Sequence, residues 1–243
     1  MTTTAAPTRV GEGLEIVDGA WSFERSVAPN FVDHVRRSVP LYDAGHELAA
    51  QFSSCFVRPG GLAYELGSST GQLLRCLATA RPRNRTVSWI GIEREPEMVE
   101  AARSYCHDVG NVKFVEADIS TTDYRPCDFA IAYLTLDFLD TEPRARTLRR
   151  VASALRPGGA LFIYEKVLAT DPRMQNLMTL LHNRLKRERG LTAEEILNKA
   201  DSLAGVMQPI TSDEYVALLR DCGFSSVVSV LKYLCFEGFV AVR

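Results

Sequence analysis

The chain has 243 residues, of which 46% are hydrophobic and 24% are charged, and its formal net charge is −2. These values are typical of a globular protein with enough apolar material for a complete core, built as one large domain or as one domain with a sizeable insertion. The near-neutral charge gives no global field for nucleic acid or an anionic membrane, and no apolar run is long enough to cross a bilayer.

The six cysteines form no C-x-x-C pair, and several of them lie in apolar runs such as CDFAIAY. This pattern is typical of reduced, mostly buried thiols in a cytoplasmic protein. No group of His, Cys, Asp and Glu residues has metal-ligand spacing, so we expect no metal site.

The N-terminal part of the chain differs in composition from the rest. Residues 1–20 are mostly small, polar or glycine, and they predict a flexible tail rather than a signal peptide. Residues 21–57 are expected to form a helical cover, because a helical pattern runs from Phe31 to Phe56.

Strand-like and helix-like patterns alternate from about Leu62 onward. Two strand patterns, CDFAIAYL and ALFIYEKV, are nearly continuous apolar runs, as expected of central strands covered on both faces. The β-α-β-α series predicts an α/β fold with a mostly parallel sheet and right-handed crossovers. The expected elements are strands in LAYELG, TVSWIGIE, VKFVEAD, CDFAIAYL and ALFIYEKV, and helices over 71–80, 96–107 and 143–155.

The C-terminal third departs from this alternation. Residues 171–207 are strongly helical and lie between the fifth strand and a helix expected over 212–221, so we interpret them as a helical cap inserted over the carboxyl edge of the sheet. The last two strand patterns, FSSVVSVL and LCFEGFVAVR, predict an antiparallel hairpin at the sheet edge. Residues 58–243 are therefore expected to form one domain that carries the cap.

The segment YELGSSTGQLLR joins the first of these strands to the following helix through a glycine turn. A dinucleotide site would need G-x-G-x-x-G, whereas the spacing here is E-x-G-x-S-x-G, formed by Glu65, Gly67, Ser69 and Gly71. A carboxylate at the strand end would repel a pyrophosphate but would suit an ammonium group. The alternative is that Gly67 and Gly71 only allow tight packing of the strand against the helix.

Two further carboxylates follow the next strands. Glu93 ends the second strand, 22 residues after Gly71, at a position from which a carboxylate can accept both ribose hydroxyls. Asp118 follows the third strand, near where an adenine amino group would lie. With their neighbours Arg94 and Ile119, these residues predict a ligand that has a ribose, an adenine and a cationic amino-acid tail but no phosphate. S-adenosylmethionine has these parts, so we predict it as the cofactor.

The order of E-x-G-x-S-x-G, GIE, EADI and LRPGG resembles the class I S-adenosylmethionine-dependent methyltransferases over roughly residues 58–243. The resemblance implies a Rossmann-like, seven-stranded, mostly parallel sheet whose last strand is antiparallel, to which the helical cap is added. It also implies transfer of a methyl group, for which we expect a small-molecule acceptor and no direct binding of nucleic acid.

A narrower resemblance, to the carboxy-S-adenosylmethionine synthases, runs almost end to end. It rests on RSVPLY, LTLDFL, LRPGGALFIYEK, His182 followed by LKRERG, and VM at Val206. Enzymes of that family join a carboxyl group from prephenate to the methyl carbon of S-adenosylmethionine, and their product serves a tRNA wobble-uridine modification. The resemblance implies that Tyr42 touches the amino-acid end of the cofactor, that Tyr133 stands at the family's asparagine after the fourth strand, and that the protein is a homodimer.

The chain departs from this family at the arginine that holds the added carboxylate. Aligned without gaps, the segment NKA places Lys199 at a matching lysine but Ala200 at the arginine. A methyl group cannot replace a bidentate guanidinium, and the lost contact would cost about 1.5–3 kcal/mol. We therefore expect the chain to use ordinary S-adenosylmethionine, with rescue of carboxylate binding by Lys199 as the alternative.

The acceptor side is expected where the cap meets the strand ends, with His182, Tyr164 and Glu165 as catalytic candidates. Methyl transfer is an in-line displacement in which the enzyme positions the two reactants and removes a proton where the acceptor needs it. Each candidate has another interpretation: His182 could be a packing residue, Glu165 could pair with Lys166, and Tyr133 could only pack on the adenine. The other histidines show no partner pattern and are interpreted as ordinary: His34, His46 and His107.

Three functions stay open on the sequence. The favoured one is a methyltransferase that acts on a small metabolite under a closed helical cap. The alternatives are a carboxy-S-adenosylmethionine synthase and a nucleoside-binding protein without transfer chemistry.

Overall fold

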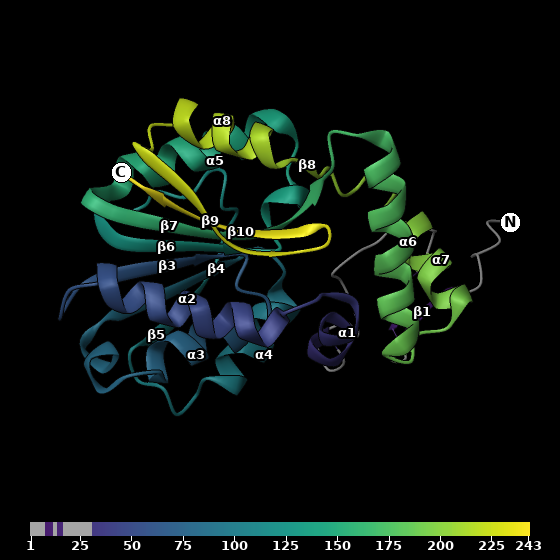
Figure 1. Cartoon of the computed structure of the whole chain (residues 1–243). Helices are drawn as coiled ribbons and strands as arrows, with labels where there is room; N and C mark the ends of the chain where they lie inside the picture. The colour runs from purple at the N-terminus through teal and green to yellow at the C-terminus, as the bar shows by residue number, and fades with distance from the viewer. Residues whose placement is uncertain (1–7, 12–13, 17–30) are drawn as a thin grey trace, which may run out of the picture.

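The computed structural model describes residues 8–11, 14–16 and 31–243. A twisted β-sheet runs through the middle of the molecule between two helical layers (Figure 1). One face is covered by α2 (Tyr42–Phe56), α3 (Gln72–Thr79) and α4 (Pro96–Tyr105), and the other by α5 (Thr141–Ala154) and α8 (Ser212–Asp221). Beyond one end of the sheet lie α1 (Phe31–Ser38), α6 (Pro172–Glu188) and α7 (Ala193–Leu203).

The central strands form from segments that are apolar on both faces. All residues of β3 (Leu62–Leu66) and β6 (Cys127–Tyr133) are buried, as strands between two helical layers must be. The remaining strands are β4 (Ser88–Glu93), β5 (Val112–Glu116), β7 (Leu155–Leu168), β9 (Ser226–Tyr233) and β10 (Phe236–Val242), in the order β5-β4-β3-β6-β7-β10-β9.

The prediction of a mostly parallel sheet with an antiparallel last strand is confirmed. Strand β10 lies between β7 and β9 and pairs antiparallel with both, so that Phe236 stands opposite Lys166 in β7 and Tyr233 in β9. The structure adds β8 (Ile210–Thr211), which pairs parallel with the end of β7. This strand is too short to leave an alternating pattern in the sequence, which explains why it was not predicted.

Several helix starts follow from local chemistry. Helix α4 begins at Pro96, as predicted, because proline fixes φ and its missing N–H would have no partner in the first turn. At the start of α8, the Thr211 hydroxyl accepts the N–H of Glu214, and the Glu214 carboxylate accepts the N–H of Thr211. The same capping box, with Thr192 and Glu195, begins α7.

The region predicted as a cap holds α6 and α7. In α6 the buried side chain is His182, whose Nε2 lies 2.7 Å from the carbonyl oxygen of Ser38 in α1. The predicted N-terminal tail contains a short antiparallel pair, β1 (Thr8–Gly11) and β2 (Leu14–Ile16), and β1 contacts α7. The other residues of the predicted tail, and residues 21–30 of the predicted cover, lie outside the described residues.

The glycine turn after β3 requires both of its glycines. Gly67 and Gly71 have φ values of 69° and 80°, in the left-handed region. A Cβ on Gly71 would lie 2.9 Å from the ring of Phe114, and a Cβ on Gly67 would lie 2.6 Å from the side chain of Thr135. The close approach lets α3 pack against β5 and α4, so the packing interpretation holds for Gly71 in particular.

The loop after β6 is held from within the core by Glu165. Its Oε1 accepts the N–H groups of Thr135 and Leu136, both at 2.8 Å. Glu165 and the neighbouring Asp137 are fully buried, and one oxygen of each has no hydrogen-bond partner. Burial raises the pKa of Asp137 to about 6, and burial with the nearby Asp137 charge raises the pKa of Glu165 well above its usual value. The pair therefore retains a proton more readily than exposed carboxyls do.

Replacing Gly71 with Ala should lower the free energy of unfolding by about 1–3 kcal/mol, because a non-glycine residue is strained at this φ and its methyl group would displace Phe114. Urea unfolding measures the change. Gly110→Ala is the matched control, since a Cβ at Gly110 meets nothing within 4 Å. Equal stability of the two variants would contradict the packing role of Gly71.

The free energy of unfolding should fall as the pH rises from about 4 through about 6, because the pKa of Asp137 is raised from 3.8 to about 6 in the fold. A carboxyl group whose pKa is raised in the folded state stabilises the protein most at pH values below its pKa in the unfolded chain. This stabilisation is lost as the pH rises through the folded-state pKa, at up to about 1.4 kcal/mol per pH unit for one proton. Asp137→Asn, whose side chain does not titrate, should show a shallower fall in urea unfolding at successive pH values. An identical slope in both proteins would contradict the role of the acid pair.

Candidate functional site

A cavity lies at the carboxyl ends of β3, β4 and β6 beneath α1 and α2, with a volume of about 990 Å³ when the open solvent at its mouth is included. Ligands of open α/β sheets bind at this edge, because the loops after parallel strands converge there. Gly71, predicted at the cofactor, lies outside the lining, against α4 and β5. The lining contains the other residues predicted at the cofactor: Tyr42, Glu65, Gly67, Ser69, Glu93, Arg94, Asp118, Ile119 and Tyr133.

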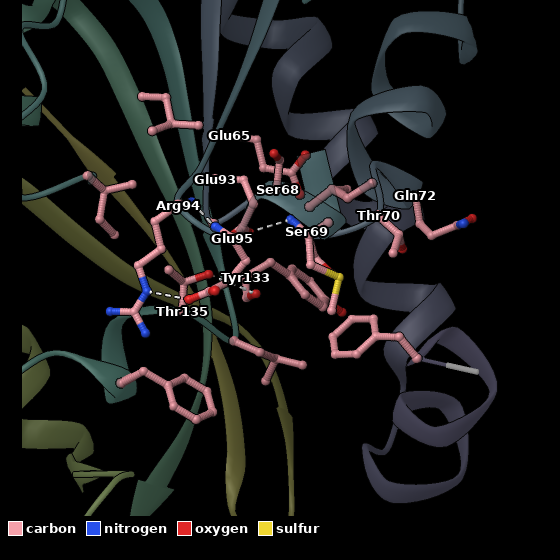
Figure 2. Close-up of a pocket in the computed structure, with 18 of the residues that line it drawn as sticks. Glu65, Ser68, Ser69, Thr70, Gln72, Glu93, Arg94, Glu95, Tyr133 and Thr135 are labelled. Carbon is pink, nitrogen blue, oxygen red and sulfur yellow. Dashed lines mark hydrogen bonds and ion pairs between the residues drawn. The ribbon is translucent and has the colours of Figure 1, made fainter. Parts of the chain in front are cut away.

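Glu65, in β3, brings an uncompensated carboxylate to this cavity (Figure 2). The residue is 3% exposed, and its Oε2 has no hydrogen-bond partner. Burial, followed by the charge of Glu93, raises the pKa of Glu65 well above its usual value. The hydroxyls of Ser68 and Thr70 in the adjoining turn are also buried without partners. An ammonium group would supply both the charge and the donors that Glu65 lacks.

Glu93, at the end of β4, ties the neighbouring loops together. Its Oε2 accepts the N–H of Ser69 at 2.8 Å, and its Oε1 accepts the N–H groups of Arg94 and Glu95 at 2.8 and 3.1 Å. The Arg94 guanidinium pairs with Glu95 at 2.9 Å (Figure 2). A carboxylate offers about four acceptor positions, so one position of Glu93 remains for a ligand hydroxyl.

The loop after β5 forms a largely apolar slot with a polar edge. Ile119 is buried, whereas Asp118 is exposed and accepts the N–H of Ser120 at 2.6 Å. Asp118 therefore places a carboxylate acceptor at the edge of an apolar part of the lining. The apolar side of the slot is lined by Ile92, Met98, Ile119, Phe138 and Leu139.

An aromatic wall closes the other end of the cavity. Tyr42 and His46 lie one turn apart on α2 and face Tyr133 of β6, with ring centroids 4.3 Å apart for Tyr42 and His46 and 4.8 Å apart for His46 and Tyr133. His46 lines the cavity, although its sequence context was interpreted as ordinary. The available signal was its spacing of four residues from Tyr42, which puts both side chains on one helix face.

The three side chains predicted as catalytic lie outside the lining of this cavity. The Tyr164 hydroxyl donates to the carbonyl of Pro40 at 2.7 Å, and Glu165 supports the loop after β6. His182 packs on Phe236 and lies against the Ser38 carbonyl, and burial lowers its pKa to about 3. The packing interpretation therefore describes the position of His182.

Tyr164 and His182 belong to a set of four side chains that fasten the segment between α1 and α2, residues 38–42. His182 lies against the carbonyl of residue 38, and Arg189 donates to that of residue 39 at 2.9 Å. Tyr164 donates to the carbonyl of residue 40, and Tyr133 donates to that of residue 42 at 2.8 Å. The segment corresponds to the RSVPLY motif, so these contacts give that motif a structural role.

The position at which the resemblance places an arginine lies outside the lining of the cavity. Ala200 is exposed, and Lys199 Nζ hydrogen-bonds His34 Nε2 and, at 3.3 Å, Ser38 Oγ. Within the described ranges, no group of three or more His, Cys, Asp or Glu side chains could hold a metal ion. No helix in the same part of the chain has the length and apolar character of a membrane span.

The cavity thus offers an ammonium acceptor at Glu65, a hydroxyl acceptor at Glu93 and a base slot that ends at Asp118. Carboxylates at three strand ends would repel a phosphate. The donor and acceptor set fits an adenosine that carries an amino-acid tail.

Comparison with known proteins agrees with this chemistry. The family described as a methyltransferase domain matches residues 63–159. The carboxy-S-adenosyl-L-methionine synthase of Staphylococcus epidermidis is 31% identical over 224 residues, which cover 92% of this chain and 97% of that protein. The synthase of Pseudomonas aeruginosa is 33% identical over 227 residues, which cover 90% and 92% of the two chains.

The fold is shared with solved structures. Human N-acetylserotonin methyltransferase in complex with SAM is 19% identical, with a TM-score of 0.61, over 88% of this chain and 55% of that one. This likeness shows the fold, whereas the identity to the synthases extends over nearly the whole chain. The chain therefore belongs to the carboxy-S-adenosyl-L-methionine synthase family, within the S-adenosylmethionine-dependent methyltransferase fold.

Proposed function

We propose that the chain is an S-adenosylmethionine-dependent methyltransferase that acts on a small metabolite in a capped pocket. The observation that carries the proposal is the buried, unpaired Glu65 carboxylate in a cavity that also contains Glu93 and Asp118. Glu65 binds the ammonium of the methionine tail, Glu93 a ribose hydroxyl and Asp118 the adenine amino group. Residues 58–243 form the domain, and the insertion at about 171–207 caps it.

The chain acts on the reaction mainly by positioning. The methyl group leaves a sulfonium along a line to the acceptor, so holding both in one geometry supplies most of the effect. Because the positive charge disappears during transfer, a strongly stabilising anion beside the sulfonium would slow the step. The aromatic wall of Tyr42, His46 and Tyr133 attracts a cation more weakly than a carboxylate does. In this proposal Tyr164, Glu165 and His182 fasten the walls and do not touch the acceptor.

A carboxy-S-adenosylmethionine synthase is the second candidate, supported by the names of the relatives. Two observations favour ordinary S-adenosylmethionine instead. Ala200 stands where the resemblance places the carboxylate-binding arginine, and Lys199, the possible substitute, already contacts His34 and Ser38. A methyltransferase that descended from this family would keep the fold but lose the side chain that contacts the added carboxylate.

We further propose a homodimer in the cytoplasm that makes no direct contact with nucleic acid. The dimer is supported by an apolar strip on α6, because large apolar side chains at a surface mark interaction sites. The net charge of −2 supports the absence of direct contact with nucleic acid. The six free thiols support the cytoplasmic location. The strip consists of Met174, Leu177, Leu180 and Leu181, each 43–47% exposed.

Glu93→Ala should weaken the binding of S-adenosylhomocysteine about 10- to 150-fold, the effect of losing a hydrogen bond to a charged group. Isothermal titration calorimetry measures the dissociation constant. Glu97→Ala is the matched control, because Glu97 is exposed on α4 and lies outside the cavity lining. An unchanged affinity of the Glu93 variant would refute the ribose assignment.

Mass spectrometry of the small molecules that copurify with the protein should detect S-adenosylmethionine or S-adenosylhomocysteine. A species heavier than S-adenosylmethionine by one CO₂ would instead contradict the methyltransferase proposal and favour the synthase. Binding of S-adenosylmethionine without turnover over a broad panel of acceptors would favour a nucleoside-binding protein.

A further inference from the structure

His46 presents an unpartnered nitrogen in the cofactor cavity. Its side chain is 6% exposed and belongs to the lining, and its Nε2 has no hydrogen-bond partner. A buried polar atom without a partner is destabilising. The proposed mechanism does not use this nitrogen, so a ligand atom is the partner to look for.

The ring of His46 is held in place from two sides. Tyr42 and Tyr133 lie against it, and the Tyr133 hydroxyl donates to the Tyr42 carbonyl at 2.8 Å. Gly45, the residue before it, allows this contact, since a Cβ there would meet the Tyr133 hydroxyl oxygen. The imidazole cannot turn away from the cavity without disturbing both tyrosines.

The lining also shows what kind of atom Nε2 would meet. Burial lowers the pKa of His46 to about 4, so the ring is neutral at physiological pH and has one N–H to donate. Ser68 and Thr70 contribute two more buried hydroxyls without partners. The unmatched set is therefore one carboxylate, Glu65, and three groups able to donate.

A zwitterionic amino acid matches this set, since it pairs an ammonium with a carboxylate on one carbon. Glu65 in β3 stands beside Ile131 of the neighbouring strand β6, two residues before Tyr133 and on the same face of the sheet. Because Tyr133 touches His46, Glu65 and His46 lie at the same end of the cavity. Among the lining residues the structure describes, Arg94 is the one Lys or Arg side chain, and it pairs with Glu95 near the ribose position. Within the described lining, no guanidinium is therefore left to bind the tail carboxylate.

We infer that His46 donates its Nε2–H to the carboxylate of the cofactor's amino-acid tail, while Glu65 binds the ammonium. The inference rests on the proposed function. According to this inference, His46 is the residue that distinguishes a ligand with the tail carboxylate from one without it, although no sequence motif identifies this histidine.

The test compares S-adenosylhomocysteine with its decarboxylated analogue, which keeps the amine but lacks the carboxylate, by isothermal titration calorimetry. The wild-type protein should bind the analogue about 10- to 150-fold more weakly. His46→Phe keeps a ring between Tyr42 and Tyr133 but removes the donor, so it should bind S-adenosylhomocysteine as weakly as the analogue. His46→Gln, which restores an N–H, should recover part of the preference.

Three results would overturn the inference. Equal binding of the two ligands by the wild-type protein would show that no residue recognises the carboxylate. This measurement does not depend on whether any variant folds. A preference kept in full by His46→Phe assigns the carboxylate to another residue. Failure of the wild-type protein to bind either ligand removes the proposed cofactor itself, and thus separates that failure from an error about His46 alone.

Discussion

Residues 38–42 link α1 to α2, and their carbonyl groups meet side chains from both the sheet and α6. Tyr133 and Tyr164, stacked 4.9 Å apart, reach them from β6 and β7, and His182 and Arg189 reach them from the α6 side. Because buried carbonyl groups need hydrogen-bond donors, these contacts fix where α2 begins. The cavity depends on that position, since α2 carries Tyr42 and His46 to the strand ends.

Charge is separated between the cavity and the helices beyond the sheet. Carboxylates of Glu65, Glu93 and Asp118 stand at the strand ends. On the cap side, burial and the nearby Lys166 lower the pKa of Lys186 to about 8. A cationic group is therefore favoured deep in the cavity, and an anionic one towards α6.

The parts of the molecule that could be predicted are those that leave a mark in local sequence. Continuous apolar runs indicated β6 and β7, and the spacing of Glu65, Gly67 and Glu93 indicated the strand ends that line the cavity. His182 and Tyr164 could be placed on their elements, but their partners are backbone carbonyls, which have no sequence signature. His46 lacks a motif because its role depends on the distant Tyr133, which only the fold brings to it.

The fastening of residues 38–42 also couples two parts of the molecule mechanically. The segments α1 and α2 cover the cavity, and a displacement of this cover would break hydrogen bonds to β6, β7 and α6 together. At about 0.5–1.5 kcal/mol for each of the four bonds, their combined loss would cost about 2–6 kcal/mol. The contacts that shape the site thus also join its cover to α6, so that a shift of α6 would be transmitted to Tyr42 and His46 at the start of α2.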